Sequence, residues 1–234
     1  MRRPKPVMEE VTSESHRPGG EFTVLDGLAS FLRHRGNTLL IKGYAGAGKT
    51  TLALQLLEQL APEGSGAYVS SRVSQEKVQA ELPWADFGKT SKTGAFSDIR
   101  LGSPASFVEE ALKLMMQKDK RGGAVVVLDT WDGIAKEMAE ADRLKAEKML
   151  IAAADASKAR AIFVSEEPAR STMDYLVDGI VELKREEQFG RIFREIEVQK
   201  LRGTMIEQHK YLYTLEGGRF VLIPPYAVPP VSRA

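Results

Sequence analysis

The stretch GYAGAGKT, residues 43–50, constrains this chain more than any other segment. It matches the pattern G-x-x-x-x-G-K-[ST], which predicts a loop that holds the phosphates of a nucleotide. The apolar run TLLIKG leads into the loop, and the helix-like segment TTLALQLLEQLA follows it. A phosphate loop lies between a strand and a helix, so this context supports the motif. The alternative is a glycine-rich turn that binds no ligand.

The residues of the loop have distinct expected roles in binding ATP and Mg²⁺. Backbone N–H groups of the loop and of the following helix N-terminus would surround the phosphates. We expect Lys49 to reach the β- and γ-phosphates and the Thr50 hydroxyl to bind Mg²⁺. Tyr44 is assigned no role. The predicted phosphate-binding set is Gly43, Ala45, Gly46, Ala47, Gly48, Lys49, Thr50 and Thr51.

Asp129 is the second predicted part of the site. It ends the apolar run AVVVLD, about 80 residues after the phosphate loop. Ligands of open α/β sheets lie at the carboxyl ends of the strands, so Asp129 is expected beside the loop as a Mg²⁺ ligand, through water. The alternative is an aspartate that only ends the strand and caps the next turn. Asp132 is expected to be an exposed loop residue.

Apolar runs alternate with helical patterns along most of the chain. Runs of continuous apolar residues between helices indicate a parallel sheet that is covered on both faces. The expected strands are 37–43, 66–71, 96–102, 122–129, 159–167 and 176–184, and the expected helices are 50–61, 75–82, 106–118 and 141–159. Further on, Ile196 and Val198 alternate with polar residues, and Gly217 and Gly218 mark the turn of a hairpin over 210–223. We therefore expect an α/β fold with antiparallel strands at its C-terminal side.

The composition sets limits on the organisation and partners of the chain. Its 234 residues suit one α/β domain, expected over 21–224, between a polar arm at 1–20 and a Pro-rich tail at 225–234. The arm is either loose or docked on a neighbouring subunit. The absence of cysteine excludes disulfides and thiolate metal sites. A net charge of +1 gives no global basic field for nucleic acid, and no apolar run or leader pattern predicts a membrane segment, so we expect a cytoplasmic protein.

Beyond the phosphate loop, the C-terminal half carries a family resemblance. The segments DYLVDGIVELK (174–184) and EVQKLRGTMIEQHKYLYTLEGGRFVLIP (197–224) resemble RecA-superfamily ATPases of the KaiC/RadA type, especially archaeal KaiC-like proteins. The phosphate loop, the strand ending in Asp129 and the pair Ser165–Glu166 agree in order and spacing over roughly 22–224. In addition, YVSSRVSQEK and LPW, within 68–84, resemble the gas-vesicle regulator GvpD and its phosphate-loop relatives.

The resemblance implies a RecA-like fold and a homo-oligomeric ring, commonly a hexamer, with ATP at the subunit interfaces. It also implies that Lys200 and Arg202 reach the nucleotide of the neighbouring subunit. Such a cation can stabilise charge on the γ-phosphate. The alternative is two solvated basic residues at a strand end. Lys200 has the strand parity of Ile196 and Val198, however, which favours a side chain that does not simply point to solvent.

The chain departs from the KaiC-like pattern after its second strand. Those enzymes usually carry there a glutamate that positions the attacking water, whereas this chain has Ser70, Ser71 and Arg72. Arg72 cannot act as a base, but it could sense the γ-phosphate. Glu76 is a weak substitute for the missing carboxylate. Glu166, with Glu167, is another catalytic candidate, and the alternative for both is an exposed loop acid.

Four functions are consistent with these residues. The leading one is a KaiC-like ATPase, slow or conditional in hydrolysis, that acts through assembly or through an unidentified protein partner. The second is a regulatory module that senses ATP without hydrolysing it. A DNA-acting recombinase paralogue would need a basic stripe, and the sequence offers only the short cluster Arg33, His34 and Arg35. A small-molecule kinase is disfavoured because the C-terminal extension is rich in strands and offers no helical lid.

Overall fold

The computed structural model describes residues 23–34, 36–61, 66–87, 94–117, 123–188, 190–206 and 208–223. The predicted arm at 1–20 and tail at 225–234 lie outside the described residues, and so does Arg35. Within the described ranges, no helix combines the length and the apolar character needed to cross a bilayer.

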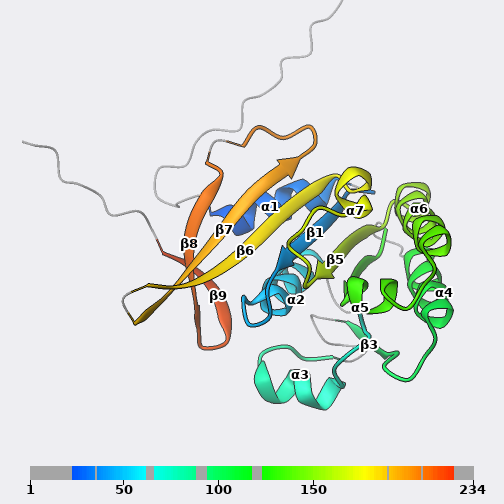
Figure 1. Cartoon of the computed structure of the whole chain (residues 1–234), viewed down its shortest axis with the longest axis horizontal. Helices are drawn as coiled ribbons and strands as arrows, with labels where there is room; N and C mark the ends of the chain where they lie inside the picture. The colour runs from blue at the N-terminus through cyan, green and yellow to red at the C-terminus, as the bar shows by residue number, and fades with distance from the viewer. Residues whose placement is uncertain are drawn as a thin grey trace, which may run out of the picture.

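A nine-stranded sheet with the order β3-β2-β4-β5-β1-β6-β7-β8-β9 forms the centre of the structure (Figure 1). The strands β1 to β6 pair in parallel, and β7 to β9 continue the sheet in antiparallel pairs. The strand bounds are Thr38–Gly43, Gly66–Ser70, Ala95–Asp98, Val125–Asp129, Arg160–Ser165, Gly179–Gln188, Arg191–Leu201, Lys210–Glu216 and Arg219–Ile223. The predicted α/β fold, with a mainly parallel sheet and C-terminal antiparallel strands, is confirmed.

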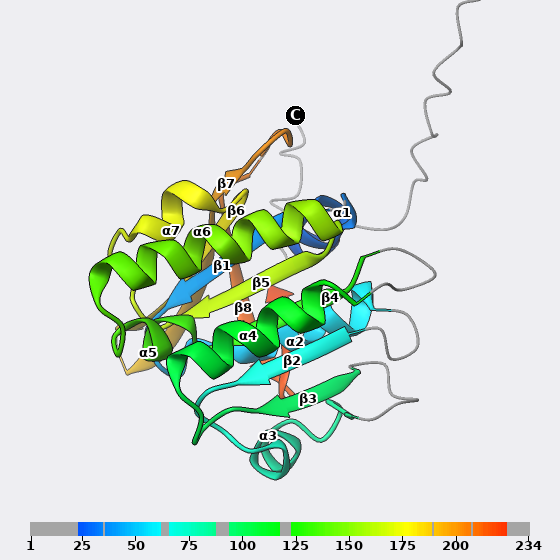
Figure 2. The same ribbon diagram turned by 90° about the vertical axis from the view of Figure 1, so that its right-hand side faces the viewer.

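Helices cover both faces of the parallel strands. Alternate residues of each strand point to opposite faces of the sheet, so neighbouring residues pack against different helices. Leu39 and Ile41 pack with α1 (Val24–Arg33) and α2 (Lys49–Leu60). Leu40 packs on the other face, among residues of α4 (Pro104–Met115) and α6 (Glu140–Ser157), which lie across the sheet in Figure 2. The remaining helices are α3 (Gln75–Glu81), α5 (Trp131–Ala135) and α7 (Thr172–Leu176).

Several elements differ from the expectation. The helices α1, α5 and α7 were not predicted; α5 and α7 have five residues each, too few to show a helical period. The strand β3 ends at Asp98, because the backbone turns from Ile99 to Gly102. The strand β6 is longer than expected and forms with β7 a ribbon that extends beyond the parallel strands (Figure 1).

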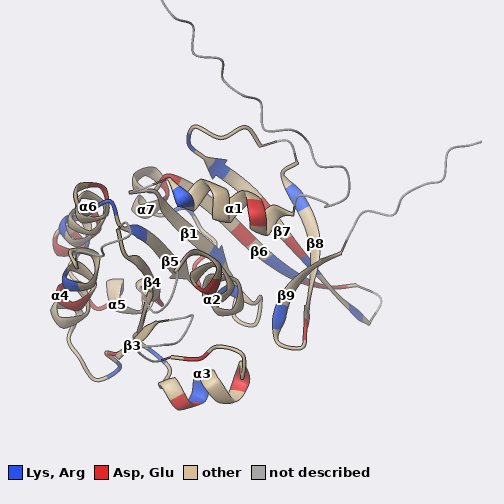
Figure 3. Cartoon of the chain, turned by 180° about the vertical axis from the view of Figure 1, so that it is seen from behind, with Lys and Arg blue, Asp and Glu red and all other residues tan. Residues whose placement is uncertain are grey.

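Charged residues of both signs are interspersed over the strands and helices. Figure 3 shows basic and acidic positions following one another along β6 and β7 and along α3. The segment LKREEQ within β6 has this mixture. On the face in Figure 3, the described elements therefore present no single basic stripe of the kind that a DNA-binding groove needs.

Candidate nucleotide-binding site

The phosphate loop joins β1 to α2 at the carboxyl edge of the parallel strands. Its backbone requires glycine at two positions where a side chain would collide. At Gly43, with φ of 146°, a Cβ would lie 2.3 Å from the carbonyl oxygen of Leu183. At Gly48, with φ of 92°, it would lie 2.8 Å from the side chain of Leu215 on β8. The loop is thus held closely between β6 and β8.

Lys49 is buried and bends back over the loop. Its Nζ donates a hydrogen bond to the carbonyl oxygen of Tyr44 at 2.9 Å. Burial lowers the pKa of Lys49, although Glu166 and Asp129 partly oppose this effect. Bound phosphates would supply the negative charge that the buried ammonium lacks, so the lysine suits the phosphate-binding role that the motif predicts.

Thr50 and Asp129 lie side by side across the site. The Thr50 hydroxyl donates to Oδ2 of Asp129 at 2.7 Å, and the hydroxyl of Tyr68 donates to the same oxygen at 2.7 Å. A hydroxyl beside a carboxylate fits Mg²⁺, which usually takes one or two carboxylates together with phosphate and water oxygens. The structure brings together the two predicted ligands; their binding of a metal stays a prediction.

Asp129→Asn should raise the thermal stability of the nucleotide-free protein at pH 7 by a few degrees. Burial raises the pKa of Asp129 in the fold, against the lowering effect of its two hydrogen bonds. A raised folded-state pKa means that ionisation opposes folding above that pKa, and this penalty disappears below the unfolded pKa, near 4. Calorimetry from pH 7 down to pH 4 should therefore show the advantage of the variant shrinking, and nucleotide binding should lose its Mg²⁺ dependence.

Asp98→Asn is the control, because the pKa of Asp98 is shifted in the opposite direction from that of Asp129. Asp98 is exposed, and its hydrogen bond from Arg100 lowers the pKa of its carboxyl. This substitution should not raise the unfolding temperature at pH 7. A lower unfolding temperature for Asp129→Asn than for the natural protein would contradict the assignment.

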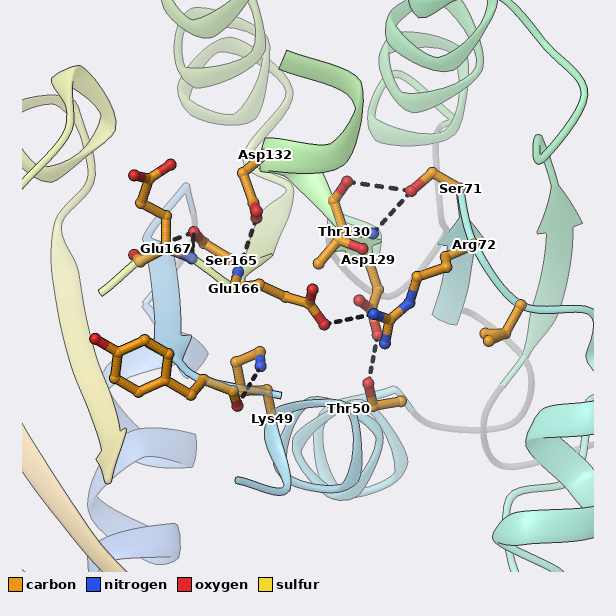
Figure 4. A network of polar contacts seen from close by, with 12 residues as sticks. Lys49, Thr50, Ser71, Arg72, Asp129, Thr130, Asp132, Ser165, Glu166 and Glu167 are labelled. Atoms are coloured by element: carbon orange, nitrogen blue, oxygen red, sulfur yellow. Dashed lines mark hydrogen bonds and ion pairs between the residues drawn. The ribbon is translucent and has the colours of Figure 1, made fainter. Parts of the chain in front are cut away.

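Ser71 and Arg72 occupy the place where KaiC-like enzymes usually carry a glutamate. The Ser71 hydroxyl accepts from the backbone N–H of Thr130 and donates to its carbonyl oxygen, each at 3.1 Å. Arg72 forms an ion pair with Glu166, Nη1 to Oε1, at 2.5 Å (Figure 4). Glu166 is therefore not a free exposed acid, and its carboxylate faces a cation from the other side of the site.

Asp132 has a structural role that the sequence did not indicate. It is half-buried, and its Oδ1 accepts from the backbone N–H of Glu166 at 2.9 Å (Figure 4). The expectation of an exposed loop residue was wrong, because the helix α5 turns Asp132 toward the loop after β5. The neighbouring Glu167 is exposed and pairs with Lys136 at 3.6 Å.

Glu81, and not Glu76, is the carboxylate of α3 that borders the site. A recess of about 110 Å³ is lined by Thr50, Thr51, Arg72, Val73, Val78, Glu81, Leu82 and Asp129. Glu76 does not line it and lies within the electrostatic reach of Arg100 and Asp98. Periodicity could not reveal this, because both residues belong to the same short helix and its orientation depends on packing.

Lys200 and Arg202 lie far from the phosphate loop of their own chain. In the sheet, Lys200 is opposite Ile180 of β6, whereas Gly43 is level with Leu183, three residues further along. At about 3.3 Å per residue, this separates them by roughly 10 Å along the strand. Lys200 is half-buried, but not on the face that its strand parity predicted. The register of β6 and β7 shifts between Ile180 and Val181, so Lys200 lies opposite Ile180, on the other face of the sheet from Val198.

Both cations contact the region of α7 instead. Lys200 Nζ donates to the carbonyl oxygens of Asp174 at 3.1 Å and of Val177 at 2.5 Å. Arg202 donates to Oδ1 of Asp178 and to the carbonyl oxygen of Tyr175, each at 3.1 Å. Burial lowers the pKa of Lys200. Within one chain, the structure does not bring the two predicted catalytic cations to the nucleotide site.

Comparisons with known proteins bear on the family and the fold of the chain. Residues 28–199 match the model of the family described as "GvpD gas vesicle protein, P-loop domain". The chain is 29% identical over 212 residues to Protein GvpD1 of Halobacterium salinarum and 30% identical over 217 residues to Protein GvpD2 of the same organism. Each match covers 83% of this chain but only 39% and 43% of the respective relative, so the chain spans about two fifths of their length.

A solved structure shares the fold. A KaiC-like protein from the hyperthermophilic archaeon Pyrococcus horikoshii superimposes with a TM-score of 0.66, covering 81% of this chain and 90% of that one. At 20% sequence identity, this likeness concerns the fold alone.

Proposed function

The chain belongs to the family of GvpD gas vesicle protein P-loop domains, and we propose that it is an ATP-binding regulator that hydrolyses ATP slowly or conditionally where its own copies meet. The observation that carries the proposal is the hydrogen bond between Thr50 and Asp129 at the mouth of a complete phosphate loop. It joins the two side chains that a nucleotide-bound Mg²⁺ would need. The RecA-superfamily KaiC-like fold, predicted from the motifs, agrees with this reading.

The nucleotide would bind along the loop and the N-terminus of α2. Backbone N–H groups of the loop and of the first turn of α2 would surround the phosphates, and the N–H of Ala47, which donates to the Tyr44 carbonyl oxygen at 3.3 Å, would have to leave that bond to join them. Lys49 would turn from the same carbonyl oxygen toward the β- and γ-phosphates. A bound Mg²⁺ would neutralise part of the phosphate charge. Thr50 and Asp129 would hold it, and the nucleotide would provide further oxygens.

Slow or conditional hydrolysis is supported by the carboxylates around the site. The resemblance to KaiC-like enzymes leads one to expect a water-positioning glutamate where this chain has Ser70, Ser71 and Arg72, and Glu166 is engaged by Arg72. Glu81 borders the recess beside Thr50 from the end of an exposed helix. An isolated chain thus has Glu81 and a paired Glu166 as carboxylates for positioning water, which favours low turnover until the site is rearranged.

Assembly of the chain with itself would complete the site. Lys200 and Arg202 are remote from their own phosphate loop, which is the placement needed to serve the loop of a neighbouring copy. The proposed assembly is therefore a homo-oligomeric ring, of six copies by analogy with KaiC-like proteins. In each interface, the carboxyl edge of one sheet would face the Lys200–Arg202 side of the next copy.

Phosphate release measured together with molar mass tests this proposal. Turnover in ATP and Mg²⁺ should rise with protein concentration in parallel with the mass from light scattering, and ADP should be compared as the second nucleotide. Turnover per chain that is constant across dilution into monomers would refute catalysis at interfaces.

The Arg72–Glu166 ion pair favours a second candidate, an ATP sensor without turnover. Arg72 is exposed over most of its side chain and can exchange the carboxylate for a γ-phosphate of like charge. Such an exchange would distinguish bound ATP from bound ADP without any chemical step.

Arg72→Ala should lower the affinity for ATP about tenfold and leave that for ADP nearly unchanged, since only ATP carries the γ-phosphate that the guanidinium would bind. Titration calorimetry with both nucleotides measures the difference. Glu166→Gln is the matched variant: it frees Arg72 and should not weaken ATP binding. Equal losses for ATP and ADP in Arg72→Ala would show that Arg72 does not read the γ-phosphate.

A further inference from the structure

A buried lysine lies on β1 directly before the phosphate loop. Lys42 Nζ donates to Oδ2 of Asp174 at 2.8 Å and to the carbonyl oxygen of Ala169 at 2.7 Å. The two charged side chains are only 3% and 12% exposed. A buried ion pair is a poor source of stability, because desolvation offsets much of the attraction. Its directional contacts, in contrast, fix the positions of the segments that it joins.

The first of these segments is the loop 166–171, which follows β5. It begins with Glu166, whose carboxylate faces Arg72 across the nucleotide site, and it includes Ala169, whose carbonyl oxygen Lys42 holds. One end of the loop thus borders the predicted γ-phosphate position. Its middle is attached to the strand that carries the phosphate loop.

The second segment is α7, which holds the two remote cations. Oδ1 of Asp174 accepts from the N–H and hydroxyl of Ser171 at 3.3 and 2.8 Å, which caps this helix. The carbonyl oxygen of the same Asp174 accepts from Lys200, and that of Tyr175 accepts from Arg202. Asp174 therefore contacts Lys42 through its side chain and Lys200 through its backbone.

We propose that Lys42 is a positioning residue that ties the loop 166–171 to α7 and so sets where Lys200 and Arg202 stand for the neighbouring subunit. The inference rests on the proposed function, because it needs these cations to act between copies. It adds a route by which the nucleotide site of one copy is connected to the next: Glu166, Ala169, Lys42, Asp174 and Lys200 form a continuous path of bonds and hydrogen bonds.

Removing both charges together avoids leaving one of them buried and unpaired. The test variant is Lys42→Met with Asp174→Asn, because methionine fills an apolar space and an asparagine oxygen can still accept from Ser171. Two further variants separate ATP binding from the supply of the arginine, so that each variant provides only one of them. Lys49→Ala chains should bind ATP only weakly but still offer Lys200 and Arg202, and Arg202→Ala chains should bind ATP but do not offer the arginine.

Mixing these two chains should restore turnover. An interface is complete where an Arg202→Ala copy provides the intact phosphate loop and a Lys49→Ala copy provides the intact arginine. Placing the double substitution in the Lys49→Ala donor should then lower the restored turnover about tenfold. Placing it in the Arg202→Ala acceptor should lower it less than about twofold. Light scattering must show equal incorporation of all chains, and thermal unfolding must show that the double variant is folded.

The outcomes separate the two proposals. Equal losses in donor and acceptor, or no loss in the donor, would overturn the role of Lys42 while leaving catalysis between copies intact. Failure of the unsubstituted mixture to restore turnover would overturn the proposed function, and with it the role of Lys42.

Discussion

Lys49→Ala is expected to remove most of the stabilisation that ATP and Mg²⁺ give to the protein, without unfolding the nucleotide-free chain. Loss of a buried, hydrogen-bonded cation from a charged ligand should weaken binding by at least about thirtyfold. ATP at a hundred times its dissociation constant stabilises a protein by about 2.7 kcal/mol, or roughly 5–11 °C for a chain of this size. At the same ATP concentration, the variant should lose at least about two thirds of this shift.

The nucleotide-free variant should remain as stable as the natural chain or become slightly more stable. Burial lowers the pKa of Lys49, so the fold bears an unfavourable desolvation term that alanine removes. Its one hydrogen bond, to the Tyr44 carbonyl, provides partial compensation. Scanning calorimetry with and without ATP and Mg²⁺ measures both effects. Lys145→Ala, which removes an exposed lysine of α6, serves as the control and should keep the full shift. An undiminished shift in Lys49→Ala would refute nucleotide binding at this loop.

The sequence predicted the parts of the site that depend on local chain order. The phosphate loop is one contiguous motif, and Asp129 follows from the rule that parallel strands end at the same edge of the sheet. The central parallel strands β1, β2, β4 and β5 were recognisable because each contains an apolar run. Such features depend on neighbouring residues, so one sequence is enough to find them.

The contacts that were not predicted join residues far apart in the chain. Arg72 and Glu166, 94 positions apart, meet because β2 and β5 both end at the carboxyl edge. The hydroxyl of Tyr213 on β8 donates to the carbonyl oxygen of Ala47, 166 positions earlier, and places the antiparallel strands beneath the phosphate loop. No periodicity encodes such pairs, because they depend on strand order and on the twist of the whole sheet.

The five-residue helix α7 is the clearest example of an element that the sequence pattern could not predict. It has too few residues for a helical period, yet it gathers Lys42, Lys200 and Arg202 around one turn. Sequence parity predicted Lys200 on the face of Ile196 and Val198, but the register shift between β6 and β7 turns it to the face of α7. Only the fold shows that its partners are the carbonyl oxygens of Asp174 and Val177.

Arg202→Ala should lower ATP turnover by a factor on the order of 10³ while leaving ATP affinity nearly unchanged, because a cation that meets the γ-phosphate from a partner acts mainly on the transition state. Its side chain is 54% exposed in the single chain, and its ion pair with Asp178 should contribute no more than about 1 kcal/mol to stability. Loss of turnover therefore cannot be attributed to unfolding. Single-turnover phosphate release, with ATP affinity measured separately, distinguishes the two effects.

Arg100→Ala is the matched control, because Arg100 is also an exposed arginine paired with an aspartate, Asp98, but lies on the β3 side of the sheet. It should retain turnover. A slow rate in Arg202→Ala that is independent of protein concentration would agree with catalysis between copies. Lys200 already lies roughly 10 Å along the sheet from the level of Gly43, and Arg202 follows two residues later, beyond the end of β7. If Arg202→Ala instead hydrolyses ATP at the natural rate in the assembled state, Arg202 takes no part in catalysis, and its contacts with α7 are purely structural.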